Sequence, residues 1–204
     1  MRIAVIVLSV NVATFLPSSL SCLSFAAGPV NLHDSTTKPV LTAIKGIDGK
    51  TYRMDDGKYR ASAIVFVAHD CPISNAYAPE INRIVNKYGS KRVQFFIVYT
   101  EKGLEAQGAR KHAREYGFRC PIALDSRHEI AKKAQVTVTP EAIVLDSKGR
   151  RSYRGRIDDL YVEIGTRRYE ATRHDLRLAL DAIVSGRQVA NPITRAVGCY
   201  IPTK

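Results

Sequence analysis

Cys71 is the residue of this sequence best placed to do chemistry. It lies three residues after the apolar run 64–68, which is typical of a strand buried on both faces, and it precedes an amphipathic helix. A cysteine at a helix N-terminus lies near unpaired backbone N–H groups and the positive end of the helix dipole. Such a position can lower the pKa of a thiol from about 8.5 to between about 3.5 and 7.5. We therefore predict an acidic, solvent-accessible and reactive thiol at Cys71.

Nearby residues are expected to tune and assist this thiol. A protonated His69 would favour the thiolate, whereas the charge of Asp70 would oppose it. Thr139-Pro140 immediately precedes another strand, where an X-Pro bond can be cis. A cis proline that faces the thiol would present backbone groups able to align an extended substrate by strand addition. The alternative for Pro140 is an ordinary trans turn.

The number of cysteines favours redox chemistry over structural cross-linking. Without residues 1–27 the chain keeps Cys71, Cys120 and Cys199, which is an odd number and too few for a disulfide scaffold. One intramolecular pair with one free thiol, or a set of transient bonds, would fit this count.

Cys199 is the favoured disulfide partner of Cys71. If the strand after Cys120 runs parallel to the strand before Cys71, the two cysteines lie at levels about 15 Å apart. A disulfide needs Cα atoms within about 7 Å. Cys199 lies on a tail that begins after Gly186, and the intervening chain could span up to about 43 Å. The alternative is a Cys199 that only packs the tail.

The elements that must position these residues follow the order of an α/β domain. Apolar runs predict strands at 64–68, 93–99 and 122–124, and the turn at 146–149 predicts a hairpin of 142–145 with 151–154. Helical periodicity predicts helices over 77–88, 104–116, from Asp125 or Ser126 to Ala134, and from Thr172 through Ile183. We expect a mixed central sheet with helices on both faces.

The first 27 residues have the pattern of a secretory signal peptide. Arg2 is followed by apolar stretches at 3–8 and 12–16, and Ser24-Phe25-Ala26 supplies small residues for cleavage. An uncleaved anchor, or lipidation at Cys22, would be the alternatives. We predict an exported protein, periplasmic or extracellular, with a loose lead-in at 28–41, one compact domain at 42–186 and a tail at 187–204.

The chain is strongly basic, with a formal net charge of +12 that becomes +11 when residues 1–27 are removed. The charges are scattered and no nucleic-acid-binding motif accompanies them, so we expect no nucleic-acid partner. A basic surface on an exported protein favours peripheral contact with anionic envelope surfaces. Ordinary solvation of the surface explains the same charge.

Three separated motifs resemble a known superfamily. The segment 66–74 with Pro79 resembles the strand, active site and helix of thioredoxin-like proteins, and 138–146 with Gly149 resembles their cis-proline strand and hairpin. More narrowly, the chain is similar to peroxiredoxin-like redoxins of the alkyl hydroperoxide reductase/thiol-specific antioxidant type at 70–75, 153–159 and 197–201. The resemblance covers about residues 40 to 201 and implies a thioredoxin-like fold.

The resemblance has two departures. Ser74 stands where thioredoxins have their second cysteine, so another thiol must resolve an adduct at Cys71. Ile64 and Ala68 replace the proline and threonine that precede the cysteine of peroxiredoxins, and Pro140 falls about where their arginine lies. The set that polarises a peroxide is therefore missing.

The resemblance implies a thiol oxidoreductase, which the signal peptide expected at 1–27 would export. Cys71 would perform thiol–disulfide exchange or reduce peroxide as an antioxidant, Thr139 and Pro140 would align the partner, and Cys199 or an external thiol would resolve the adduct. The partner would be a thiol or disulfide protein or an external thiol reductant, with no cofactor and no metal. The alternative is a catalytically degenerate redoxin scaffold that binds a protein partner or copper.

The remaining polar candidates receive structural roles. Arg154, Arg156, Asp158 and Asp159 resemble the signature of the group and are expected to form an ion-pair network, although Arg156 and Ser74 are also candidate modulators of Cys71. The histidines outside the motif have no metal-ligand spacing and are expected at the surface or at helix caps; these are His33, His112, His128 and His174.

Overall fold

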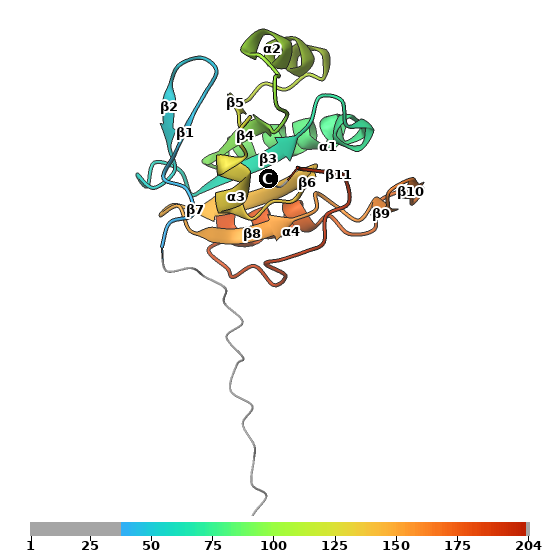
Figure 1. Cartoon of the computed structure of the whole chain (residues 1–204). Helices are drawn as coiled ribbons and strands as arrows, with labels where there is room; N and C mark the ends of the chain where they lie inside the picture. The colour runs from blue at the N-terminus through green and yellow to red at the C-terminus, as the bar shows by residue number, and fades with distance from the viewer. Residues whose placement is uncertain (1–37, 203–204) are drawn as a thin grey trace, which may run out of the picture. The chain divides into compact units, whose positions relative to one another are not determined.

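A five-stranded mixed sheet is the centre of the computed structural model, which describes residues 38–202 (Figure 1). The strand order is β5-β4-β3-β7-β8. Three strands are parallel: β3 (Ala61–Val67), β4 (Val93–Tyr99) and β5 (Ile122–Leu124). The hairpin strands β7 (Glu141–Asp146) and β8 (Arg151–Gly155) are antiparallel additions next to β3. The predicted mixed sheet and its hairpin are confirmed.

Helices cover both faces of this sheet, and β3 is therefore buried along its whole length. Val65 and Val67 face the core shared with α1 (Pro72–Gly89), α2 (Ala106–Glu115) and α4 (Asp175–Val184). Ile64 and Phe66 face the opposite core, which includes residues of α3 (Glu129–Ala134) and of the hairpin β1 (Ala43–Lys45)–β2 (Thr51–Arg53). The unbroken apolar run therefore arises from burial on two sides.

Helix α1 leads directly away from the end of β3. Pro72 occupies its first turn, where a missing backbone N–H costs nothing. Its apolar face is buried against the sheet through Ile73, Tyr77, Ala78, Ile81, Ile84 and Tyr88. The helix begins five residues earlier than the predicted 77–88, because Ile73 lies one turn before Tyr77 on the same buried face and a proline is tolerated in the first turn.

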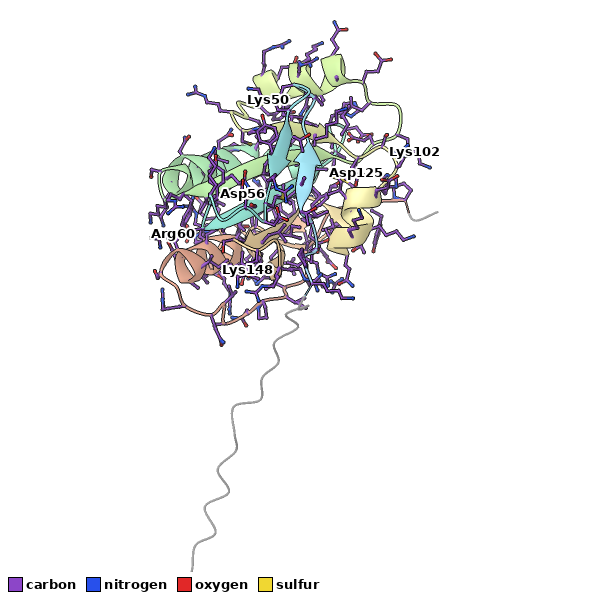
Figure 2. The ribbon with its side chains drawn as sticks, turned by 90° about the vertical axis from the view of Figure 1, so that its left-hand side faces the viewer. Lys50, Asp56, Arg60, Lys102, Asp125 and Lys148 are labelled. Atoms are coloured by element: carbon purple, nitrogen blue, oxygen red, sulfur yellow. A yellow bond between two sulfur atoms is a disulfide. The ribbon has the colours of Figure 1, made fainter. Side chains whose placement is uncertain are left out.

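Two helix starts differ from their predictions. Helix α3 begins at Glu129, and Asp125 instead accepts hydrogen bonds from the backbone N–H groups of Ile130 and Ala131 at 3.1 and 2.7 Å. Figure 2 shows Asp125 beside this helix. Helix α4 begins at Asp175 rather than at Thr172, because the Thr172 hydroxyl donates to a carboxylate of Asp159 at 2.6 Å and does not cap the helix.

Several short strands were not predicted from the sequence. They are β1, β2, β6 (Val138–Thr139), β9 (Tyr161–Glu163), β10 (Thr166–Arg167) and β11 (Cys199–Tyr200). Each has two or three residues, too few for an alternating pattern to be recognised. The pair β6 and β11 matters most, because it brings the end of the chain beside Thr139 and Pro140 (Figure 1).

The predicted signal peptide at 1–27 and most of the lead-in at 28–41 lie outside the described residues. Among residues 38–202, no helix combines the length and apolar character needed to cross a membrane. Figure 2 shows Lys50, Arg60, Lys102 and Lys148 at separate places, on four different loops. The positive charge is therefore dispersed on this side of the molecule.

Candidate active site at Cys71 and Cys199

Cys71 is the N-cap residue of α1, as the sequence predicts. Its backbone is extended, with φ −86° and ψ 112°, and its carbonyl accepts the N–H of Asn75 at 3.0 Å. No side chain caps the first turn of the helix, so free N–H groups remain near the sulfur. The position therefore has the electrostatic character that stabilises a thiolate.

Cys71 forms a disulfide with Cys199, across a sequence separation of 128 residues and a Cα–Cα distance of 6.2 Å. This is the pair favoured by the reach of the tail. The expected accessibility of Cys71 is wrong for this disulfide form, because its side chain is only 1% exposed. Cys71 belongs to the hydrophobic core on the α1 face of the sheet, and Cys199 is the partly exposed member of the pair.

The peptide bond between Thr139 and Pro140 is cis, as predicted. The carbonyl oxygen of Thr139 lies 3.3 Å from the Cys71 sulfur, so the cis-proline segment borders the reactive atom. Strand β11 pairs antiparallel with β6, with Cys199 opposite Thr139 and Tyr200 opposite Val138. The tail is thus aligned on the backbone that was expected to align a substrate.

Further contacts fix the register of the tail. The backbone N–H of Ile201 donates to the carbonyl of Thr137 at 2.9 Å, and the Thr139 hydroxyl donates to the carbonyl of Cys199 at 3.4 Å. Gly198 passes so close to β6 that a Cβ atom there would overlap the carbonyl of Thr139 and lie 3.0 Å from the nitrogen of Pro140. The residue before Cys199 must therefore lack a side chain.

Cys120 is a free cysteine outside this site. It precedes β5, which is parallel to β4 and therefore to β3, as the distance estimate assumed. Burial raises the pKa of its thiol to about 12. Cys120 is thus a neutral thiol at physiological pH, and a suitable internal reference for the reactivity of Cys71.

The predicted modulators of Cys71 have other contacts. The Nδ1 atom of His69 lies 2.5 Å from a carboxylate oxygen of Glu101, so the charge of a protonated His69 would be paired there. Asp70 is exposed. Ser74 is buried, and its hydroxyl oxygen accepts the N–H of Ala68 at 3.4 Å. Ser74 therefore holds the turn that carries Cys71.

His112 is buried, so its predicted surface or cap role is wrong. The Tyr99 hydroxyl oxygen lies 2.8 Å from His112 Nδ1, and His112 Nε2 lies 3.0 Å from the Asn75 side-chain oxygen. Asn75 donates through its amide to the carbonyl of His69 at 3.0 Å. This series of hydrogen bonds links the core to the turn that carries Cys71. The position of His112 on one helical face with Ala109 and Ala113 is the sequence signal for its burial.

Acidification is expected to destabilise the fold through His112. Burial, with a smaller effect of His69, lowers the pKa of His112 below 6.5. As the pH falls through about 6.5, the unfolded chain binds a proton that the folded chain does not, so this part of the stability is present above that pH and is lost below it. Urea unfolding at about pH 7.5 and pH 5.5 should show a smaller stability difference between wild type and His112→Gln at the lower pH. A difference that does not change with pH would contradict this role.

The residues of the predicted ion-pair network form ion pairs, but with other partners than one another: Arg154 with Glu141, Arg156 with Asp175 and Asp159 with Arg168. Arg156 Nε lies 2.7 Å from a carboxylate oxygen of the buried Asp175. Although burial raises the pKa of Asp159, hydrogen bonds from Thr172 and the backbone of Arg173 lower it to about 2. Its neighbour Asp158 accepts the Tyr77 hydroxyl at 2.6 Å. Arg156 thus pairs with Asp175, and no contact between Arg156 and Cys71 supports its predicted role as a modulator of that thiol.

Two groups of side chains within residues 38–202 bring metal-ligand atoms within 4.8 Å of one another. They are His69, Asp70 and Glu101, and Glu80, Asp158 and His174. Neither group contains a cysteine. Carboxylates of both groups already have partners: Glu101 faces His69, Glu80 pairs with arginines and Asp158 accepts the Tyr77 hydroxyl. The copper alternative through Cys71 therefore gains no support from these groups.

Comparison with protein families gives a match to the family described as Redoxin over residues 34–161. The matched region is more than half of the 204 residues. It contains Cys71 and the cis bond before Pro140 but ends before the tail with Cys199. Among curated proteins, no match was found.

Solved structures are similar over most of the chain. An uncharacterized conserved protein from Geobacillus kaustophilus is 29% identical, with a TM-score of 0.67 over 79% of this chain and 88% of that one. A hypothetical protein from Sinorhizobium meliloti 1021 is 19% identical, with a TM-score of 0.69 over 80% and 92%. MTB dsbF is 16% identical, with a TM-score of 0.53 over 72% and 99%. With the family match, these structures show a thioredoxin-like α/β fold.

Proposed function

Because the chain belongs to the redoxin family, we propose that it is an exported thiol–disulfide oxidoreductase that cycles between a Cys71–Cys199 disulfide and two thiols. One observation carries this proposal. The sulfur at the N-terminus of α1 is bonded to a cysteine that lies opposite the residue before the cis proline. A disulfide whose only role was to hold the tail against the domain would not need to use the sulfur of Cys71.

Reduction of a substrate disulfide proceeds in two exchange steps. The Cys71 thiolate attacks one substrate sulfur, a Cys71–substrate disulfide forms, and the other substrate sulfur leaves as a thiolate. The Cys199 thiolate then attacks the Cys71 sulfur, the Cys71–Cys199 bond forms, and the first substrate sulfur leaves as a thiolate. The substrate gains two electrons, and the pair of cysteines is oxidised.

An external thiol reductant returns the protein to the dithiol. Cys71 is 1% exposed in the disulfide form, whereas Cys199 is partly exposed, so the incoming thiolate attacks the Cys199 sulfur. The Cys71 sulfur leaves as a thiolate, which the start of α1 stabilises. A second reductant thiol then releases Cys199 and becomes part of a reductant disulfide.

Disulfide exchange fits the site better than peroxide reduction does. Ile64 and Ala68, at the places of the peroxide-polarising proline and threonine, are buried apolar residues.

Export to the periplasm or the cell exterior is supported by residues 1–27 and agrees with a disulfide, since such bonds persist in oxidising compartments.

The Cys199→Ser variant tests the proposal by trapping the first step. With one equivalent of a protein disulfide substrate, reduced Cys199→Ser should accumulate a Cys71–substrate adduct, because the resolving thiol is absent and the remaining Cys120 is a neutral thiol outside the site. Wild type should instead form the Cys71–Cys199 disulfide and release reduced substrate. Non-reducing electrophoresis and peptide mass spectrometry would identify both products.

Cys120→Ser is the matched control, since it also removes one cysteine but leaves the proposed pair intact. It should behave as wild type. If Cys199→Ser forms no adduct at Cys71, or forms it at Cys120, the proposed cycle is wrong. A partner that binds Cys71→Ser and wild type equally, without exchange, would support the alternative of a degenerate binding scaffold.

A further inference from the structure

The end of the chain is bound as an extended peptide would be bound. Cys199 and Tyr200 pair with β6 in antiparallel register, Ile201 continues the pairing through its hydrogen bond to Thr137, and the sulfur of Cys199 meets Cys71 at the same point. Backbone pairing, rather than side-chain packing alone, therefore sets which residue faces the reactive sulfur. An external segment that replaced the tail on β6 would meet the same steric limits at each position.

The position before the reacting cysteine admits only glycine. Gly198 lies against the carbonyl group of Thr139 and the nitrogen of Pro140, and a Cβ atom would overlap the carbonyl. The obstructing atoms belong to the backbone, which cannot turn aside as a flexible side chain can. A larger residue at this position would therefore push the whole segment away from β6.

The two positions after the cysteine differ from each other. Tyr200 is 79% exposed, so this position makes little demand on the side chain. Ile201 is 6% exposed and belongs to the hydrophobic core on the α3 face of the sheet. The position two residues after the cysteine therefore requires an apolar side chain.

A cleft of about 660 Å³ lies along the tail. Its walls include the tail itself, from Ile193 to Gly198, and, on the domain, Val138, Glu141, Arg154 and Ile164. Chain that precedes the glycine of a bound segment would face this open space. We therefore expect no strict limit on the residues before the glycine.

We propose that the substrates of Cys71 are protein segments with the pattern Gly-Cys-x-apolar, which bind in extended form on β6 in place of the tail. This inference rests on the proposed function, because it names the substrates of the same thiol. The tail is then an internal copy of the substrate, and Cys199 resolves the adduct by returning to the position that the substrate has occupied.

A test needs a protein with β6 uncovered and a set of matched peptides. Gly198→Val/Cys199→Ser in the full chain removes both the resolving thiol and the glycine that lets the tail approach. The probe is the tail sequence Val-Gly-Cys-Tyr-Ile-Pro as a mixed disulfide with thionitrobenzoate. The Cys71 thiolate attacks the peptide sulfur, a Cys71–peptide disulfide forms, and coloured thionitrobenzoate leaves.

Three altered peptides separate the positions. Gly198→Ala and Ile201→Asp in the peptide should each slow adduct formation by about 10- to 100-fold, as expected for a forced clash or a buried charge. Tyr200→Ser should change the rate by less than about 2-fold, since the side chain is exposed. Mass spectrometry checks that the peptide, and not thionitrobenzoate, is attached to Cys71.

Reaction with free dithiobis(nitrobenzoate) separates this inference from the proposed function. Cys71 should react faster with it in Gly198→Val/Cys199→Ser than in Cys199→Ser, because the tail no longer covers the sulfur. If Cys71 is unreactive toward this reagent in both variants, the proposed function fails, and the inference fails with it. If Cys71 reacts but the two variants are alike, or the glycine and alanine peptides react alike, only the substrate pattern is overturned.

Discussion

Replacing Cys71 with serine is expected to lower the rate of disulfide reduction by at least about 10³-fold. The thiolate is the nucleophile of disulfide exchange, and a serine hydroxyl is not ionised near neutral pH. Cys199 does not replace it, because it lies on a separate strand rather than at the start of α1. The measurement is the initial rate of reduction of an insulin-type disulfide in the presence of an external thiol.

Cys120→Ser is the control for this loss. Burial raises the pKa of Cys120 to about 12, so this thiol is not ionised near neutral pH and its removal should leave the rate unchanged. If the Cys71→Ser variant retains the wild-type rate, or if the Cys120→Ser variant loses it, the proposed role of Cys71 is wrong.

Reduction of the Cys71–Cys199 bond is expected to lower the free energy of unfolding by about 4 to 5 kcal/mol. The bond closes a loop across 128 residues, and in the chain-entropy model long loops restrict the unfolded chain most. The other contacts of the tail do not depend on this bond: β11 pairs with β6, the backbones of Pro192 and Thr194 bond to Arg154, and Ile201 is buried. The expected loss therefore comes from the freedom that the unfolded chain gains. The oxidised protein is therefore the more stable form.

Urea unfolding with and without reductant measures this difference. Cys199→Ser should unfold as reduced wild type does, whether or not reductant is present, and Cys120→Ser should show the full effect of reduction. Equal unfolding midpoints for oxidised and reduced wild type would show that the disulfide does not stabilise the native state.

The sequence predicted the elements with strong patterns. The uninterrupted apolar run at 64–68 and the helical stripe that follows it placed Cys71 at the end of a strand and the start of a helix. The turn at 146–149 correctly indicated the antiparallel hairpin β7–β8. These features depend on local periodicity and turn chemistry, which can be read from neighbouring residues.

The features that depend on distant contacts were predicted less well. Nothing local indicates that Cys199 and Tyr200 form a strand, because their partners lie in β6, about sixty residues earlier. For the same reason Gly198 was not recognised as a required glycine, and Cys71 was expected to be exposed although it is buried in the disulfide form. The start of α4 was misplaced because Thr172 binds Asp159 instead of the helix.

The acidity of Cys71 in the reduced protein tests the central claim most directly. The measurement is the rate of alkylation of Cys71 by a small uncharged reagent as a function of pH, followed by mass spectrometry, with Cys120 as the internal reference. We predict a midpoint for Cys71 below about 7.5, as for thiols at helix N-termini, and a far higher one for Cys120. A midpoint for Cys71 near about 8.5, the value of an unperturbed thiol, would contradict the account.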